Sequence, residues 1–208
     1  YSKVPVKAND RSSWSFLNSG TNFGSVESGI EVESKGLGKT YGAELTLMRH
    51  FAKGYYYSLT GSYVRQRYKG SDGEWRWGAF DNQYILNALG GYEYKISNEV
   101  TLEFSAKYTL AGGKPYTPIN KEKSAQRNST YYLDDEAFSQ RMQDYSRLDL
   151  RLDIRHNMQN VSVISYFSLE NVLDNRNTQR FLFDSNSNEV EQVYQMGRFF
   201  VGGVRVEF

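Results

Sequence analysis

The sequence predicts an all-β protein built as an antiparallel meander of strands. Apolar and polar side chains alternate with a period of two along seven stretches of the chain, whereas helical periodicity is absent. The connections between these stretches alternate between short turns and long polar loops. Pro5, Pro115 and Pro118 lie in or beside the expected loops, where a missing N–H does not interrupt a strand ladder.

The stretch 144–156, DYSRLDLRLDIRH, shows the alternation most clearly. Successive side chains of a strand point to opposite faces, so this strand has one aliphatic face and one charged face. The aliphatic face carries Leu148, Leu150, Leu152 and Ile154. The charged face carries Arg147, Asp149, Arg151, Asp153 and Arg155. Because these charges alternate in sign, neighbouring charges along this face of the strand partly neutralise one another.

The remaining elements follow in order along the chain. Residues 1–6 are expected to be the tail of a strand whose beginning is missing, and residues 7–37 a long polar loop with a short hairpin around Trp14 and Phe16. Strands are expected at 39–50, 55–68, 82–96, 100–110, 144–156, 161–171 and 199–208. Short turns are expected at 51–54, 97–99 and 157–160, and long loops at 70–81, 112–143 and 172–190. All short turns therefore lie at one end of the sheet and all long loops at the other.

Composition narrows the class of protein. The 208 residues suffice for one domain, and a formal charge of +1 gives no general attraction to nucleic acid. No stretch approaches the ~18 apolar residues of a membrane-spanning helix. The chain has no cysteine, so disulfides and thiolate metal sites are excluded, and we expect no cofactor. It begins at Tyr1 without a methionine, which indicates a processed product or a fragment.

The distribution of aromatic residues predicts which face lies outside. Tyrosine and phenylalanine gather towards the ends of the apolar faces, and aliphatic or small residues occupy the middles. This is typical of a lipid-facing band on a transmembrane β-barrel. A soluble β-sandwich or lipocalin-like barrel would instead place aromatic residues in the middle of the strands. The opposite faces are too charged for a dry core, so we expect Glu103, Lys107 and the charged residues between 147 and 155 to face a polar lumen.

The last strand supports the barrel interpretation. It ends the chain on an aromatic residue of the outward face, which resembles the assembly signal of bacterial outer-membrane barrels. The residues of that parity are Phe200, Gly202, Val204, Val206 and Phe208. The resemblance implies the barrel-assembly machinery as a partner.

Six sequence stretches carry a wider resemblance. They are GKTYGAELTL (38–47), YKGSDGEWR (68–76), AGGKPYTPI (111–119), DYSRLDLRL (144–152), SLENVLDNRN (168–177) and VGGVRVEF (201–208). In this order they resemble the C-terminal part of a TonB-dependent outer-membrane receptor of the kind common in Bacteroidota. The stretches cover most of the chain after residue 38, while residues 1–37 match only loosely.

The resemblance implies a barrel of about 22 strands that is plugged by an N-terminal domain and imports scarce nutrients with energy from TonB. Residues 1–208 would supply about 7–8 of these strands, with 1–37 mostly a strand tail and an extracellular loop. The implied location is the cell outer membrane. The implied partners are outer-membrane lipid, the plug domain and upstream strands of the same receptor, and the TonB complex through the N-terminal part.

Other functions stay open at this point. The transported substrate is a siderophore, cobalamin, an oligosaccharide or a peptide, and the sequence does not distinguish them. A free-standing small barrel with a structural or adhesive role is the main alternative. Eight strands suffice to close such a barrel around a filled interior.

A barrel hydrolase is a further alternative, but the two histidines argue against an enzyme. His50 and His156 both lie beside short turns, and only His50 shares the parity of the polar face. We therefore expect solvated strand ends without a catalytic role. The acidic run 134–136 has the oxygen chemistry of a cation site, although unspaced acidic runs are usually solvated.

Three aromatic residues at the long-loop end are candidates for contact with an extracellular ligand. They are Trp75, Trp77 and Tyr116, whose rings could stack on a sugar or a chelate. Packing between neighbouring loops is an equally good explanation for them. The charged wall at 147–155 is expected to contact the plug domain, as the resemblance implies.

Overall fold

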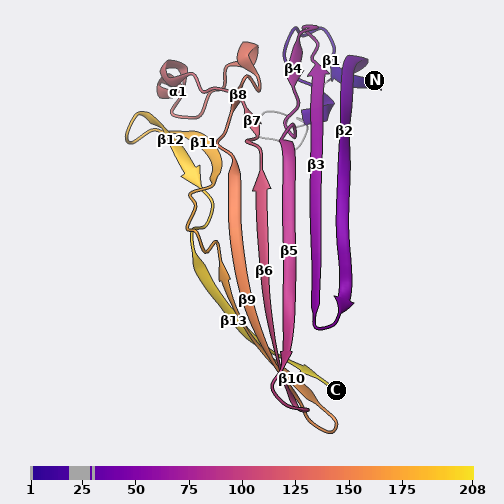
Figure 1. The fold of residues 1–208 in the computed structure, drawn as a ribbon. Helices are drawn as coiled ribbons and strands as arrows, with labels where there is room; N and C mark the ends of the chain where they lie inside the picture. Colours follow the sequence, from indigo (N-terminus) through magenta and orange to yellow (C-terminus); the bar gives the residue numbers. More distant parts are fainter. Residues whose placement is uncertain (1, 19–28, 30) are drawn as a thin grey trace.

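The computed structural model describes residues 2–18, 29 and 31–208. Most of them form one antiparallel nine-stranded sheet, which confirms the predicted meander (Figure 1). Eight strands follow one another across it: β1 (Ser2–Lys7), β2 (Val32–Ala52), β3 (Tyr55–Lys69), β5 (Gln83–Lys95), β6 (Val100–Ala111), β9 (Tyr145–Asn157), β10 (Ser162–Glu170) and β13 (Phe199–Glu207). The ninth, β4 (Trp75–Trp77), pairs with the end of β3.

The alternation of side chains continues from strand to strand, because each strand pair stays in a regular register over the middle of the sheet. One apolar row crosses five strands: Leu47, Leu59, Ala88, Tyr108 and Leu148. The adjacent row on the other face is polar: Thr46, Thr60, Asn87, Thr109 and Arg147. The sheet as a whole therefore has an apolar face and a charged face.

The apolar face is uncovered in the described chain. Leu45 is 76% exposed and Phe200 is 82% exposed, and large apolar side chains between them are exposed as well. The others on this face include Tyr41, Leu47, Leu59, Tyr63, Leu86, Tyr92, Tyr94, Phe104, Phe167, Val204 and Val206. Water-soluble monomers rarely expose apolar patches of this extent.

A packed core lies at the long-loop end instead. Tyr68 is fully buried and meets Phe138 edge-on, with ring centroids 6.1 Å apart. Ala79 and Ala137 complete this cluster, and Leu17 packs against it. Segments distant in sequence are thus joined above the sheet, on the side of the long loops (Figure 1).

The turns agree with the sequence prediction, but the long loops contain more structure than expected. The connections at 53–54, 96–99 and 158–161 gather at one end of the sheet (Figure 1). The expected loop 112–143 contains β7 (Pro115–Tyr116), α1 (Lys121–Arg127), η2 (Asp134–Glu136) and β8 (Gln140–Arg141). The expected loop 172–190 contains β11 (Thr178–Asp184) and the first residues of β12 (Glu189–Tyr194), and the two strands pair as a hairpin.

Three expectations near the N-terminus are corrected. Strand β2 begins at Val32 rather than Lys39, because its first residues pair with β1. Pro5 lies inside β1 at a register shift, where the absent N–H interrupts no regular pairing. The expected hairpin around Trp14 is a buried loop followed by a 3-10 turn, η1 (Phe16–Asn18). Tyr1 of the expected strand tail, and residues 19–28 and 30 of the expected loop, lie outside the described residues.

Candidate functional site: the charged face of the sheet

The charged face carries a line of ion pairs along β9. Arg147 Nε lies 2.6 Å from Asp149 Oδ1, and Arg147 also pairs with Glu170 on β10. Arg151 pairs with Asp153 at 2.6 Å, which continues the line along the strand. The pairs within β9 join residues i and i+2, which share a face of a strand. The side chains are partly exposed, so each pair adds at most about 1 kcal/mol and mainly fixes the orientation of the guanidinium groups.

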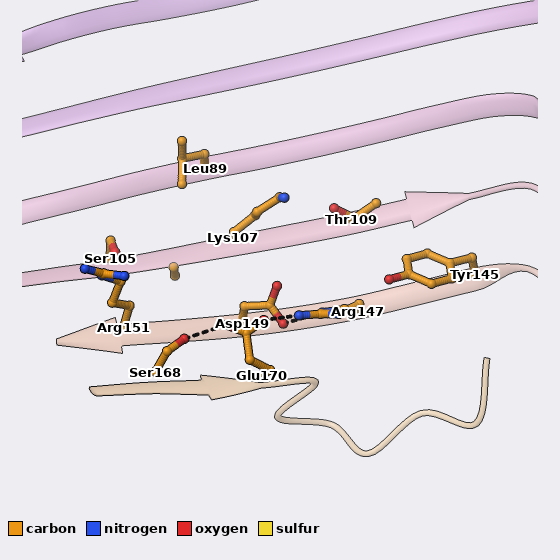
Figure 2. Close-up of a pocket in the computed structure, with 11 residues that line it drawn as sticks. Leu89, Ser105, Lys107, Thr109, Tyr145, Arg147, Asp149, Arg151, Ser168 and Glu170 are labelled. Atoms are coloured by element: carbon orange, nitrogen blue, oxygen red, sulfur yellow. Dashed lines mark hydrogen bonds and ion pairs between the residues drawn. The ribbon is translucent and has the colours of Figure 1, made fainter. Parts of the chain in front are cut away.

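Beside these pairs the face is hollowed. A hollow of about 410 Å³ extends over β5, β6, β9 and β10 (Figure 2). Its lining is mostly polar: Leu89, Ser105, Ala106, Lys107, Thr109, Tyr145, Arg147, Asp149, Arg151, Ser168 and Glu170. Ammonium, guanidinium, carboxylate and hydroxyl groups thus meet in one hydrated depression. Such a surface can bind the polar surface of another protein segment through many hydrogen bonds.

The predicted lumen-facing residues all share this face. Lys107 pairs in register with Asp149, and Glu103 with Asp153. Glu103 also accepts a hydrogen bond from the Tyr56 hydroxyl at 2.8 Å, which extends the polar network to β3. At the other end, Arg155 lies 3.1 Å from Glu207 on β13. The common face is confirmed, whereas contact with a lumen or a plug domain stays a prediction.

The stretch 171–177 forms a compact turn above this face. Asn171 is buried, and its backbone N–H donates to Asp149 Oδ1 at 2.9 Å. Its side-chain amide donates to Asn175 O and Met196 O. Asn177 is also buried and exchanges two 2.9 Å hydrogen bonds with the backbone of Ser146. The stretch SLENVLDNRN therefore connects the ends of β9 and β10 through hydrogen bonds.

The last strand has the predicted parity. Phe200 pairs with Leu169, and Val204 pairs with Ser165, both on the apolar face. Gly202 and Val206 continue the same row, opposite Phe167 and Val163. Phe208 lies beyond the end of β13 and is fully exposed. A role of this strand in barrel assembly stays a prediction.

The three candidate ligand-binding aromatics do not share one surface. Trp75 and Trp77 line a second hollow of about 370 Å³ with residues 135–139. Tyr116 packs its ring 4.5 Å from that of Phe181 instead, and burial raises the pKa of the Tyr116 hydroxyl. Trp77 is overlaid by Arg65 and Arg67, at 4.2 and 4.1 Å from its ring centre. Packing within the chain thus accounts for Tyr116 and Trp77.

The histidines and the acidic run lie at opposite ends of the sheet. His156 is exposed and lies 3.9 Å from the exposed Glu99, at the short-turn end of the sheet. His50 is exposed near another short turn. Asp134 accepts hydrogen bonds from the backbone and hydroxyl of Ser13, at 3.0 and 2.7 Å. Within the described ranges no group of three or more His, Cys, Asp or Glu residues is placed to hold a metal ion.

The fold and its charged face together define an antiparallel β-sheet protein with one apolar and one polar surface. Comparison of the chain with protein-family models and with curated proteins finds no match. Among the described residues, no helix is both long enough and apolar enough to cross a membrane.

Proposed function

We propose that the chain is part of the outer-membrane barrel of a TonB-dependent nutrient importer. The observation that carries the proposal is the uncovered apolar face, which backs directly onto a charged face. In water this arrangement leaves an extensive apolar surface hydrated, which is unfavourable by roughly 25 cal/mol per Å². A bilayer against the apolar face and a polar lumen against the charged face would give each face a matching environment.

The edges of the sheet support a segment of a larger barrel. β1 pairs only with the first part of β2, so the edge of β2 from Lys39 to Ala52 has no partner in the described chain. The outer edge of β13 is likewise unpaired among the described residues. Unpaired backbone groups cost several kcal/mol each in hydrocarbon, so these edges require further strands. A free-standing eight-stranded barrel would instead pair β1 with β13.

The charged face would then line the lumen, where the plug domain resides. The ion pairs along β9 hold three arginines and their carboxylate partners in fixed orientations on that face. Their hollow offers donors and acceptors to a facing polar segment. The substrate of such an importer is a siderophore, cobalamin, an oligosaccharide or a peptide.

Spin labels placed on adjacent residues of β9 test the proposal. Nitroxides at positions 150 and 151 of the full-length protein in lipid vesicles should differ in collision rate with a lipid-soluble relaxant. The label at 150 should be accessible to oxygen, and the label at 151 to a water-soluble nickel complex. Equal accessibility at the two positions, or the reverse order, would refute the barrel assignment.

Phe208 provides a second test, at the level of assembly. If its exposed ring belongs to an assembly signal, deletion of Phe208 lowers the amount of protein in the outer membrane while ligand affinity per assembled molecule stays the same. Surface abundance and ligand binding are measured separately. If Phe208 is instead an ordinary frayed strand end, its deletion would leave the abundance unchanged.

A further inference from the structure

The short strand β4 leaves one of its two edges open at the long-loop end (Figure 1). It pairs with β3 alone, so its second edge has no strand partner in the described chain. Gly78 N donates to Gln66 O on β3 at 2.9 Å, and the backbone groups of successive residues alternate between the two edges of a strand. The N–H and C=O groups of Trp75 and Trp77 therefore point to the open edge.

The second hollow, of about 370 Å³, lies beside this open edge and has two walls. One wall is β4, and the other is the segment 135–139. The Arg76 guanidinium donates to Asp135 O at 3.4 Å, and Phe138 N donates to Thr117 Oγ1 at 3.1 Å, so the second wall is held in place. A site whose walls are fixed before a ligand arrives loses less conformational entropy on binding.

Three exposed carboxylates make the second hollow acidic. They belong to Glu74, Asp135 and Glu136. The ion pairs of the described residues include none of the three, whereas Arg76, the cation of the lining, pairs with Asp72 at 2.7 Å. The Arg76 side chain is only 10% exposed, so its charge is both neutralised and covered. The lining therefore carries an excess of negative charge.

The cations near the two tryptophan rings do not belong to this lining. They are Lys39, Lys69, Arg65, Arg67 and Arg141. The first four lie on β2 and β3, beyond the paired edge of β4, and the described lining of the second hollow contains none of the five. Arg141 pairs with the buried Asp81. Positive charge thus lies towards the paired edge of β4, and negative charge towards the open edge.

We infer that the open edge of β4 binds an extended basic peptide, which adds a strand to the sheet within the second hollow. The backbone groups of Trp75 and Trp77 would pair with the peptide backbone, as in strand addition to other sheet edges. Lysine or arginine side chains of the peptide would meet the three carboxylates. Charge selects this occupant, because a second copy of the same edge would bring like charges together.

The inference goes beyond the proposed function, since it concerns docking at the long-loop end and uses no property of the apolar face. Fluorescence anisotropy of a labelled peptide tests it with the full-length protein in micelles of a non-ionic detergent. The probe is the peptide threonine–lysine–valine–lysine–threonine with blocked ends. We expect saturable binding that weakens as salt is added. A peptide with glutamine in place of both lysines should bind more weakly, by about two- to fivefold for each lost charge pair.

Substitutions in the protein locate the binding site. Glu74→Gln and Glu136→Gln should each weaken binding of the lysine peptide about two- to fivefold, as expected for one exposed charge pair. Glu122→Gln is the matched control and should leave the affinity unchanged. Glu122 is also an exposed carboxylate, but it lies on α1 and outside the lining of the second hollow. All three side chains are exposed, so the variants should fold as the parent protein does.

Backbone methylation of the peptide distinguishes strand addition from attraction between charges alone. A methyl group on one peptide nitrogen removes an N–H donor and leaves the net charge unchanged. Successive N–H groups of an added strand point alternately towards β4 and away from it. Methylation at successive positions should therefore weaken binding in alternation, about tenfold where the N–H faces β4 and less than about twofold elsewhere.

Each measurement has a result that overturns the inference. Equal affinities of the lysine and glutamine peptides would rule out recognition of a basic strand. Methylation effects of the same size at every position would rule out strand addition. An affinity that is the same for Glu74→Gln, Glu136→Gln and the parent protein would place the peptide outside the second hollow.

Discussion

The long-loop end buries its large apolar side chains within the chain, whereas the body of the sheet leaves them exposed on one face. At the long-loop end, Tyr68 and Phe138 are buried by the chain itself, with Asp81 enclosed beside them. In the body of the sheet, Leu45 and Phe200 project into the surroundings and the opposite face is charged. Among the buried apolar residues of the described chain, Ile164 lies away from the long-loop end, where it pairs with Arg155 near a short turn.

Under the proposed function, the two regions face two different solvents, water at the long-loop end and lipid along the apolar face. A region that buries its own apolar residues is stable in water, because burial occurs against other parts of the chain. A sheet in an outer-membrane barrel, as proposed, instead buries its apolar face against lipid. The long-loop end should therefore respond to substitutions as a soluble domain does, and the sheet as a membrane protein does. The predictions below test this contrast.

The largest effect is expected at Asp81. Asp81→Asn removes the charge that neutralises the half-buried Arg65 and Arg141. Breaking a buried ion pair on one side costs about 3–5 kcal/mol, because the partner charge stays desolvated. Hydrogen exchange in the segments 70–82 and 112–143 should accelerate accordingly, while exchange in β6 and β9 stays slow. The same loss in micelles and in vesicles would agree with a water-type core, and a loss that depends on the lipid would contradict it.

The next effect concerns the adjacent residues Leu45 and Thr46, which are both exposed but on opposite faces. Leu45→Arg should lower the free energy of unfolding in vesicles by about 2–3 kcal/mol, since it places a charge in the lipid band near its middle. Thr46→Arg, the matched control, should change it by less than ~0.5 kcal/mol, as surface substitutions usually do. Urea titration monitored by gel mobility measures both. An equal effect of the two changes would contradict the two-solvent interpretation.

A smaller effect is expected at Asn171, where the two regions join. Its backbone is left-handed, with φ of 51°, and its amide bonds two backbone carbonyls. Asn171→Ala should cost about 2 kcal/mol, from backbone strain and from lost hydrogen bonds. Asn171→Gly keeps the loss of hydrogen bonds but relieves the strain, so it should cost less. Thermal unfolding in detergent compares the two, and an alanine variant no worse than the glycine variant would argue against strain.

The sequence predicts the body of the sheet well, because burial on one face imposes a strict period of two. The stretches 55–68 and 144–156 show that period and form strands within one residue of the expected limits. Residues 32–38, rich in Gly, Lys and Ser, show none and become strand through pairing with β1 and, at Leu37 and Gly38, also with β3. In β11 the consecutive apolar residues Phe181, Leu182 and Phe183 break the alternation, so the hairpin was missed.

The candidate site, too, could be predicted from the sequence only in part. The charged face follows from parity alone, so Arg147, Asp149 and Lys107 could be grouped from the sequence. The ion pair between Asp81 and Arg141 spans 60 positions, and no local pattern indicates it.

The caps of α1, by contrast, have local sequence signals that could have predicted the helix. Asn120 accepts a hydrogen bond from Lys123 N, and Asn128 ends the helix in a left-handed conformation. Both asparagines are ordinary helix boundary signals that a search for strands overlooks.

The smallest effect is expected at the tip of the β11–β12 hairpin. Asp184 accepts hydrogen bonds from the backbone N–H groups of Asn186 and Ser187, at 3.0 and 3.4 Å. The bond from Asn186 holds the pKa of Asp184 below its ordinary value of 3.8. A depressed pKa in the folded state means that the stabilisation is present above the ordinary value and is lost as the pH falls through the folded-state pKa. Amide exchange at Asn186 should therefore show excess protection at neutral pH that disappears in acid.

Asp184→Asn separates this contribution from that of the neighbouring acidic residues. The asparagine carbonyl oxygen still accepts the hydrogen bond from Asn186, while the longer bond from Ser187 to the second oxygen is lost, and the side chain does not titrate. Glu189, which pairs with Lys121 at 2.5 Å, is unchanged in the variant, so only the difference between the two pH profiles belongs to Asp184. Because Asp184 is partly exposed, water competes for its carboxylate, and the difference should stay small and confined to the hairpin. Spread of the acid effect into β9 or β10 would show that the hairpin supports the sheet and is not independent of it.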